Sequence, residues 1–156
     1  MSIYNPIAVY PAPPIFPIPK KCPKTVTHEL SKSFGQFWFD SSACANSMRR
    51  TVEAIMDDLE VTFPPKDDPK KRVLHKRIEE FGKKNRNNQV VSDLLMGIKW
   101  LGNYGSHLAE NLHSKSDLLD GFEILAVVIE RLYDADSVQV EAMAKQITAN
   151  KGKPAA

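Results

Sequence analysis

The sequence predicts an all-α fold, a bundle of five to six helices with a proline-rich extended strap at the N-terminus. Large apolar residues recur every three or four positions after residue 24, and no segment keeps the strict alternation of a strand. A third observation sets the first boundary, because seven of the eleven prolines lie in the first 23 of the 156 residues. We therefore expect an extended segment at 1–24, a helical domain at 25–134, and a short helix with a flexible tail at 135–156.

The first 24 residues are predicted to form a strap that lies in a groove of its own domain or of a partner. Proline removes a backbone donor and pushes the preceding residue into extended geometry, which excludes a helix here. Between the prolines stand eight large apolar residues, which a solvated linker has no reason to carry. They are Ile3, Tyr4, Ile7, Val9, Tyr10, Ile15, Phe16 and Ile18. A disordered arm is the alternative that the composition leaves open.

Apolar stripes with three- and four-residue steps then define the helices one after another. We expect helices at about 25–39, 41–61, 69–82, 88–103 and 116–134, and a short sixth at 137–149. Thr25 or Thr27 is expected to cap the first helix, and Ser41 or Ser42 the second. Gly82 is expected to end the third.

The composition is that of an ordinary globular protein, with 42% apolar residues, 26% charged residues and a net charge of +2. No apolar run approaches the roughly 18–20 residues of a membrane helix, and the N-terminus lacks the features of a signal peptide. We therefore expect a cytoplasmic protein without membrane contact. Cys22 and Cys44 are expected to be thiols, with a disulfide as the alternative. No zinc spacing and no nucleotide-loop, Rossmann, zincin or serine-hydrolase motif is present, so no metal and no cofactor are expected.

The charge is unevenly distributed along the chain. Residues 66–88 hold nine Lys or Arg against four Asp or Glu, a local charge of +5, whereas residues 108–156 carry −3. Eight of these nine form the expected basic edge, namely Lys70, Lys71, Arg72, Lys76, Arg77, Lys83, Lys84 and Arg86. They are candidates for binding the phosphates of a nucleic acid, and the alternative is a solvated helix face.

The segment from Gly97 to His107 is the candidate for chemistry. Three of the seven glycines lie in it, which predicts either a helix that closely approaches another helix or a helix end. Lys99, Asn103 and His107 are four residues apart, so a continuous helix places them on one face. An Asn and a His one turn apart suit the positioning and protonation of a phosphodiester, with a cation nearby for the developing charge.

Two stretches carry a resemblance to a known family. They are SMRRTVEAIMDDL, with Arg49, Arg50 and Glu53, and KWLGNYGSH, which ends the fourth expected helix. Together with the proline-rich start, they resemble the HEPN superfamily of all-α domains, and more closely its bacterial branch described as domain of unknown function, family 4145. The resemblance covers about residues 1–134. Catalytic HEPN proteins carry Arg, a polar residue and then His, whereas here Gly102 stands before Asn103.

The resemblance implies an HEPN-like nucleic-acid-associated protein of a bacterial defence or stress system that cleaves RNA without a metal ion. Asn103 and His107 would be the catalytic pair. Arg49, Arg50 or Lys99 would stabilise the transition-state charge, and Glu53 would orient them. Lysine replaces arginine only in part, because it lacks the bidentate fork. The family also implies a homodimer in which two motifs share one cleft.

Each of these residues also has a structural interpretation. His107 would cap a helix end, Asn103 would be a buried amide that fixes helix packing, and Glu53 would pair with Arg49 within one helix. Trp100 is expected to fill the core or an interface rather than to stack on a base. On this alternative the protein is a non-catalytic helical module for dimerisation or for docking a partner protein.

Overall fold

The computed structural model describes residues 10–61, 74–106 and 113–154, and these residues form six helices and no strand. The helices are α1 (Lys24–Gln36), α2 (Ser41–Asp58), α3 (Leu74–Lys83), α4 (Arg86–Ser106), α5 (Lys115–Tyr133) and α6 (Ala135–Ala149). The all-α class predicted from the apolar period is therefore confirmed for the described part of the chain. The expected start of the third helix, at 69–73, lies outside the described residues.

Both predicted N-caps are wrong. Helix α1 has Pro23 as its N-cap residue and no side-chain cap, because the proline ring carries no acceptor for the first N–H groups of the helix. In α2 the cap is Asp40, one residue before Ser41, and its carboxylate accepts a hydrogen bond from the backbone N–H of Ala43 at 2.9 Å. A carboxylate at this position also favours the positive end of the helix dipole.

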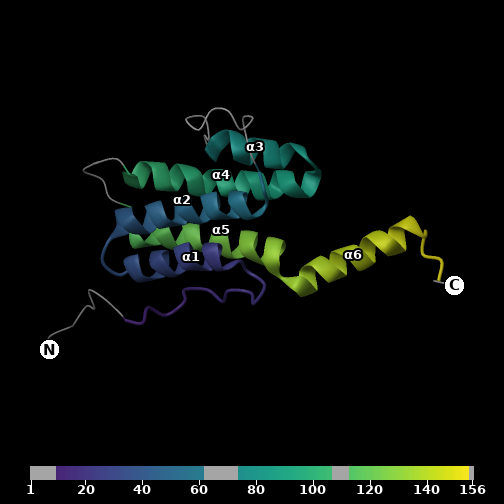
Figure 1. Ribbon diagram of the computed structural model, residues 1–156, viewed down its shortest axis with the longest axis horizontal. Coiled ribbons are helices and arrows are strands. Elements are labelled where there is room, and N and C mark those ends of the chain that lie inside the picture. The colour runs from purple at the N-terminus through teal and green to yellow at the C-terminus, as the bar shows by residue number, and fades with distance from the viewer. Residues whose placement is uncertain (1–9, 62–73, 107–112, 155–156) are drawn as a thin grey trace.

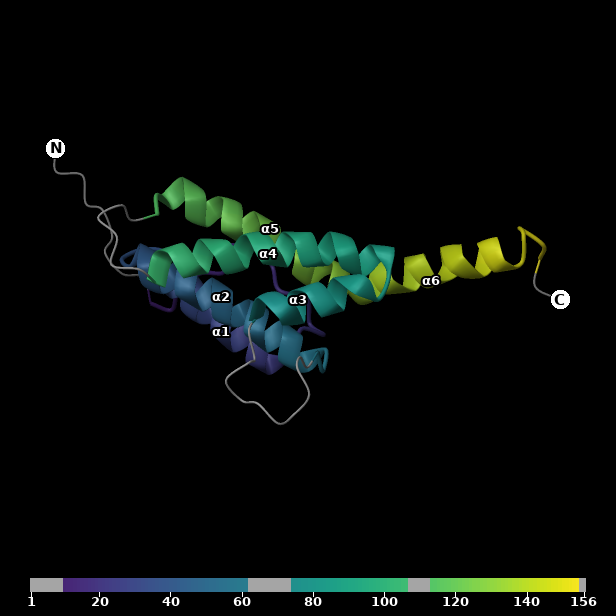
Figure 2. The ribbon, with the colours of Figure 1, turned by 90° about the horizontal axis from the view of Figure 1, so that it is seen from above.

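Helix α2 lies at the centre of the bundle, where it packs against α1, α4 and α5 (Figure 1). Helix α4 is the second hub and contacts α2, α3 and α5, so that α3 lies on the outer side of α4 (Figure 2). Gly82 does not end α3 as predicted. It lies one residue inside the helix, where a Cβ would stand 2.7 Å from the hydroxyl of Ser92 on α4. The glycine is thus needed for the approach of α3 to α4.

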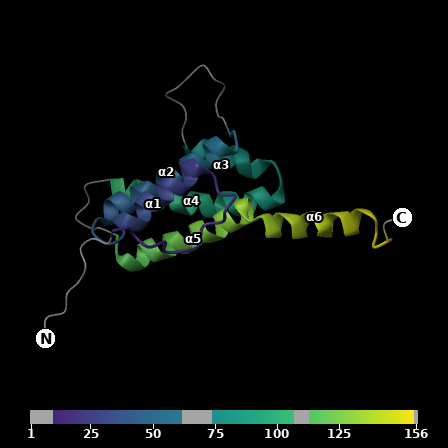
Figure 3. The ribbon, with the colours of Figure 1, turned by 60° about the horizontal axis from the view of Figure 1, so that its bottom comes forward.

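The core combines aliphatic side chains of all five bundle helices with a group of aromatic rings. Phe34 of α1 and Phe122 of α5 have ring centroids 5.4 Å apart. Phe16 of the N-terminal segment packs edge-on against Phe34, with centroids 5.2 Å apart. The stretch 10–23 is non-helical and runs beside α1 and α5 (Figure 3). Residues 1–9 lie outside the described residues, so the strap as a whole stays a prediction.

Helix α6 projects from the end of α5 away from the bundle (Figures 1 and 3). Of the described elements, it contacts α5 alone. Three large apolar side chains on one of its faces are exposed, namely Val140, Met143 and Ile147. None of the helices within the described ranges is long and apolar enough to cross a membrane.

Candidate functional site

Helices α2 and α4 approach each other closely at Gly102. A Cβ at this position would lie 2.4 Å from the Cβ of Arg49 and 2.9 Å from the backbone oxygen of Ala45. Backbone atoms cannot move aside cheaply, so no side chain fits here. This contact confirms that the glycines around position 102 include a close helix approach.

Arg49 runs across the surface that Gly102 leaves free. Its Cδ would stand 3.3 Å from a Cβ on Gly102, so the side chain lies against the turn of α4 that carries Asn103. The Nη1 atom of Arg49 pairs with the Oε1 atom of Glu53 at 2.8 Å, which confirms the predicted pair within one helix. The Nε atom of Arg49 is buried and has no hydrogen-bond partner. Arg50, the neighbouring candidate, is exposed.

Lys99 is a buried cation, only 7% exposed. Its Nζ lies 3.5 Å from the centre of the Trp100 ring and 3.4 Å from the Nδ1 atom of His75 on α3. Burial, and then the positive charge of Arg49, lower the pKa of Lys99 from its ordinary value. Among the ion pairs of the described residues, none joins Lys99 to a carboxylate. A bound anion would compensate the charge of this buried ammonium, which has no acidic partner among the described residues.

Trp100 does not fill the core, because its side chain is 58% exposed, and its expected place in an interface stays a prediction. Tyr104, one turn further along α4, is 47% exposed. Tyr104 was not among the predicted site residues, although its spacing of four residues from Trp100 puts both on one helix face. His75 and His113 were not predicted either, because their contacts with α4 depend on tertiary packing.

Asn103 is half-buried on α4, one turn after Lys99. Helix α4 continues to Ser106, so the predicted helical spacing between Lys99 and Asn103 is confirmed. His107 lies outside the described residues. The structure therefore places Arg49, paired with Glu53, against the turn of α4 at Gly102, and Asn103 follows Gly102 directly in the sequence.

The predicted basic edge is only partly described. Lys70, Lys71 and Arg72 lie outside the described residues, and Lys76, Lys83, Lys84 and Arg86 are exposed. Arg77 does not belong to this edge, because it is buried and its Nη2 donates to Asp57 Oδ1 at 2.6 Å. Its Nε donates to the backbone oxygen of Val61 at 2.7 Å, so the side chain ties α3 to the end of α2.

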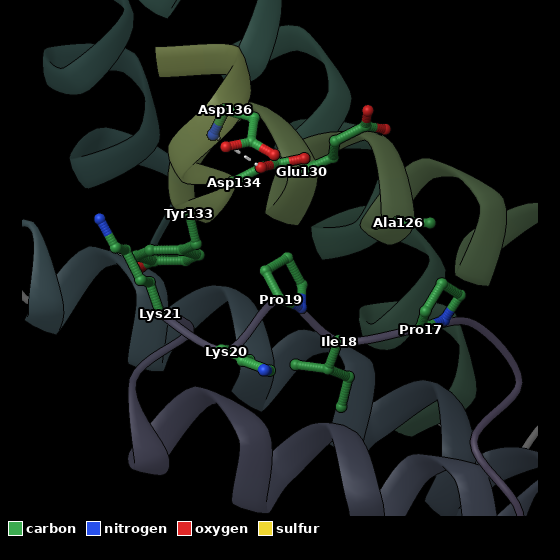
Figure 4. A pocket seen from close by; sticks show the side chains of 10 residues that line it. All are labelled: Pro17, Ile18, Pro19, Lys20, Lys21, Ala126, Glu130, Tyr133, Asp134 and Asp136. Atoms are coloured by element: carbon green, nitrogen blue, oxygen red, sulfur yellow. Dashed lines mark hydrogen bonds between the residues drawn. The ribbon is translucent and has the colours of Figure 1, made fainter. Parts of the chain in front are cut away.

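A pocket of about 740 Å³ lies elsewhere, between the N-terminal segment and α5 (Figure 4). Pro17, Pro19 and Lys21 line one side, and Glu130 and Tyr133 line the other. The pocket contains none of the predicted site residues, so the predicted chemistry does not lie in it. Across the residues that the structure describes, no group of three His, Cys, Asp or Glu side chains is placed to hold a metal ion. Both cysteines are free and buried.

The described residues form an all-α helical bundle. Positively charged side chains lie at its α2–α4 contact, and α4 also carries exposed aromatic rings. Comparison with known proteins places this bundle in a family. The model of the domain of unknown function DUF4145 matches residues 32–150, and the chain belongs to that family. No curated protein and no solved structure matches the chain.

Proposed function

We propose that the chain is an HEPN-like nucleic-acid-associated protein of a bacterial defence or stress system, and that it cleaves RNA without a metal ion. The observation that carries the proposal is the position of Arg49 against Gly102. The guanidinium that catalytic HEPN proteins carry beside the polar residue would here come from α2. In this proposal the guanidinium comes from α2 instead of α4, and it still reaches the turn of α4 that holds Asn103.

In the proposed reaction, the ribose 2′-oxygen attacks the adjacent phosphorus. The O2′–P bond forms and the P–O5′ bond breaks, which yields a 2′,3′-cyclic phosphate and a 5′-hydroxyl. One proton leaves the 2′-hydroxyl and one is given to the 5′-oxygen. His107 would perform one of these transfers, and His107 of a second copy in a homodimer would perform the other.

The remaining groups would act on the phosphate. The Asn103 amide would donate to a non-bridging oxygen, and Arg49 would offer its guanidinium N–H groups to the developing negative charge. Glu53 would hold Arg49 in place through the 2.8 Å ion pair. Lys99 would add a positive charge whose burial makes its attraction to a phosphate stronger than in water.

The test is cleavage of a fluorescently labelled single-stranded RNA in the presence of EDTA. We expect products ending in a 2′,3′-cyclic phosphate, and loss of cleavage by at least about 100-fold in His107→Ala. Arg49→Lys should retain part of the activity and Arg49→Gln none, because lysine keeps the charge but not the fork. Lys24→Gln, an exposed change on α1 outside the predicted sites, is the control.

Full activity in the double variant Asn103→Ala/His107→Ala would refute the catalytic assignment. Thermal melts of each variant are needed beside the assay, since Asn103 is half-buried. Loss of activity counts only where the melting temperature is retained.

The second candidate is a non-catalytic module for dimerisation or for docking a partner protein, with the N-terminal segment contributing to assembly. The exposed stripe of α6 favours it. A helix of 15 residues that packs on little else is marginal in water, so a partner would stabilise it. Sedimentation of Met143→Ser/Ile147→Ser against Val127→Ser, an exposed change on α5, tests this candidate. Unchanged self-association in the α6 variant would exclude α6 as the dimer contact.

A further inference from the structure

The outward face of α4 carries two aromatic rings one turn apart. Trp100 and Tyr104 are 58% and 47% exposed, although large aromatic side chains usually bury most of their surface. Four residues of α-helix advance about 6 Å along the axis, so the two rings are neighbours on one surface. Asn103 precedes Tyr104 in the sequence, and its side chain leaves the helix about 100° away around the axis.

Each ring is held by a histidine from another segment. The ring of His75 on α3 meets Trp100 edge-on, with centroids 6.3 Å apart. The ring of His113, which precedes α5, lies 5.1 Å from that of Tyr104. His113 is itself fixed, because its Nε2 lies 2.8 Å from the backbone oxygen of Leu101. Rings that are already oriented lose less freedom when a flat ligand stacks on them.

Lys99 determines which face of Trp100 is available. Its Nζ lies 3.5 Å from the ring centre, so this face is occupied by a cation. A stacking ligand therefore takes the opposite face. The Lys99 ammonium thus lies directly behind the Trp100 ring. Within the described residues it has no carboxylate partner.

The surrounding charge selects the kind of ligand. Arg49 is near enough to Lys99 for its positive charge to lower the Lys99 pKa, and Arg49 is itself paired with Glu53. Arg50 adds an exposed positive charge on α2. Flat rings beside positive charges match the bases and phosphates of a nucleic acid strand better than an apolar protein surface.

We propose that Trp100 and Tyr104 stack on two consecutive bases of single-stranded RNA, on the face of the Trp100 ring that Lys99 leaves open. This proposal rests on the proposed function and specifies its substrate as unpaired RNA. Paired bases stack on one another and offer no free face, so a duplex would not bind in this way.

The test measures binding separately from cleavage. The ligand is an eight-nucleotide 2′-O-methyl RNA, because a methylated 2′-oxygen cannot attack the phosphate. The protein carries Trp38→Phe, so that Trp100 is the one remaining tryptophan. The indole N–H of Trp38 has no hydrogen-bond partner, so phenylalanine removes no bond. The readouts are quenching of Trp100 fluorescence and the dissociation constant from fluorescence anisotropy of a labelled strand.

We expect the RNA to quench Trp100 and the matching duplex to bind at least about 10-fold more weakly. In the protein with both native tryptophans, Trp100→Ala and Tyr104→Ala should each weaken binding by about 5- to 100-fold, the range for loss of one stacked base. Trp100→Phe should restore most of the affinity. The salt dependence of binding should be unchanged in Trp100→Ala, since the phosphate contacts remain.

Two control variants accompany these changes. Tyr10→Ala removes an exposed ring outside α4, and Val90→Ala removes an exposed apolar side chain on the same face of α4. Neither should change RNA affinity. If instead Val90→Ala and Trp100→Ala both abolish self-association and leave RNA affinity unchanged, the face is a protein interface and the proposal is wrong. Equal binding of single strand and duplex also overturns it.

Failure of this proposal and failure of the proposed function give different results. Tight, Trp100-dependent binding of the methylated strand without cleavage of ordinary RNA would keep the stacking surface and remove the nuclease. Cleavage of ordinary RNA with an unchanged KM in Trp100→Ala and Tyr104→Ala would keep the nuclease and remove the stacking surface.

Discussion

The contact between Gly102 and Arg49 shows how one residue sets the distance between two helices. Gly97, five residues earlier on α4, differs in its surroundings, since a Cβ there would meet no atom within 4 Å. Gly97 and Gly102 therefore form a matched pair within α4, in which Gly102 is required by packing and Gly97 is not.

We predict opposite effects of alanine at these two positions. Gly102→Ala should lower the free energy of unfolding by about 1–3 kcal/mol, because the added carbon forces α2 and α4 apart. Gly97→Ala should raise it by about 0.5–1 kcal/mol, because alanine loses less backbone entropy in an exposed helix interior. Urea denaturation of the two variants measures both. A stable Gly102→Ala protein would mean that α2 and α4 separate more easily than the 2.4 Å approach implies.

Lys99 gives a residue-scale prediction with a defined pH dependence. Its pKa is lowered mainly by burial, so the protonated form opposes folding. This destabilisation is complete below the lowered pKa and disappears as the pH rises to the unfolded value, 10.5. Lys99→Met keeps the apolar stem and should raise stability by about 1 kcal/mol at pH 7, which is the burial cost less a cation–π gain.

Denaturant midpoints of wild type and Lys99→Met across pH 7–10.5 provide the check. The difference between the two proteins should shrink as the pH increases. A variant that is less stable at pH 7 would show that the contacts of Lys99 with His75 and Trp100 outweigh its desolvation. Greater stability together with weaker RNA binding would place Lys99 among the residues kept for function.

At the scale of the elements, Arg77 links α3 to the end of α2 through hydrogen bonds. Arg77 bridges Asp57 and the backbone oxygen of Val61 while it is only 7% exposed. The sequence counted this arginine among the phosphate-binding candidates. Charge counting does not reveal which face of a helix a residue occupies, and Arg77 lies on the inner face with Leu74, Ile78 and Phe81.

Arg77→Met should therefore destabilise the protein by about 2 kcal/mol, because it leaves the Val61 carbonyl without its charged donor. Asp57→Asn should cost less than about 1 kcal/mol, since the Asp57 side chain is 69% exposed and the ion pair is screened by water. Lys84→Met, on the exposed part of the same segment, should leave the melting temperature unchanged. Thermal melts compare the three variants, and equal effects of the first two would show that the ion pair carries the contact.

The helices themselves were predictable because each one has an apolar face with a regular period. Their ends were less predictable. Asp40, rather than a serine, caps α2, and Gly82 is retained for contact with Ser92 rather than for a turn. Both outcomes depend on which neighbours a residue meets, and the local sequence does not contain this information.

At the scale of the molecule, the bundle α1–α5 and the projecting helix α6 differ in how they are supported. Removal of residues 135–156 should change the free energy of unfolding by less than about 1 kcal/mol, because α6 buries little against the bundle. Urea denaturation of the shortened chain at low protein concentration tests this. A large loss would mean that α6 covers part of the bundle in solution.

The sequence by itself determined the helical class, the approximate positions of the helices and the segment around Asn103. It did so because apolar period and glycine spacing are local properties of the chain. Only the tertiary structure decided that Arg49 lies on Gly102, that Lys99 is buried beside His75, that Trp100 is exposed and that Arg77 is buried. These contacts join residues on different helices or different faces. Their geometry arises when α2, α3 and α4 pack together, and no spacing along one segment encodes it.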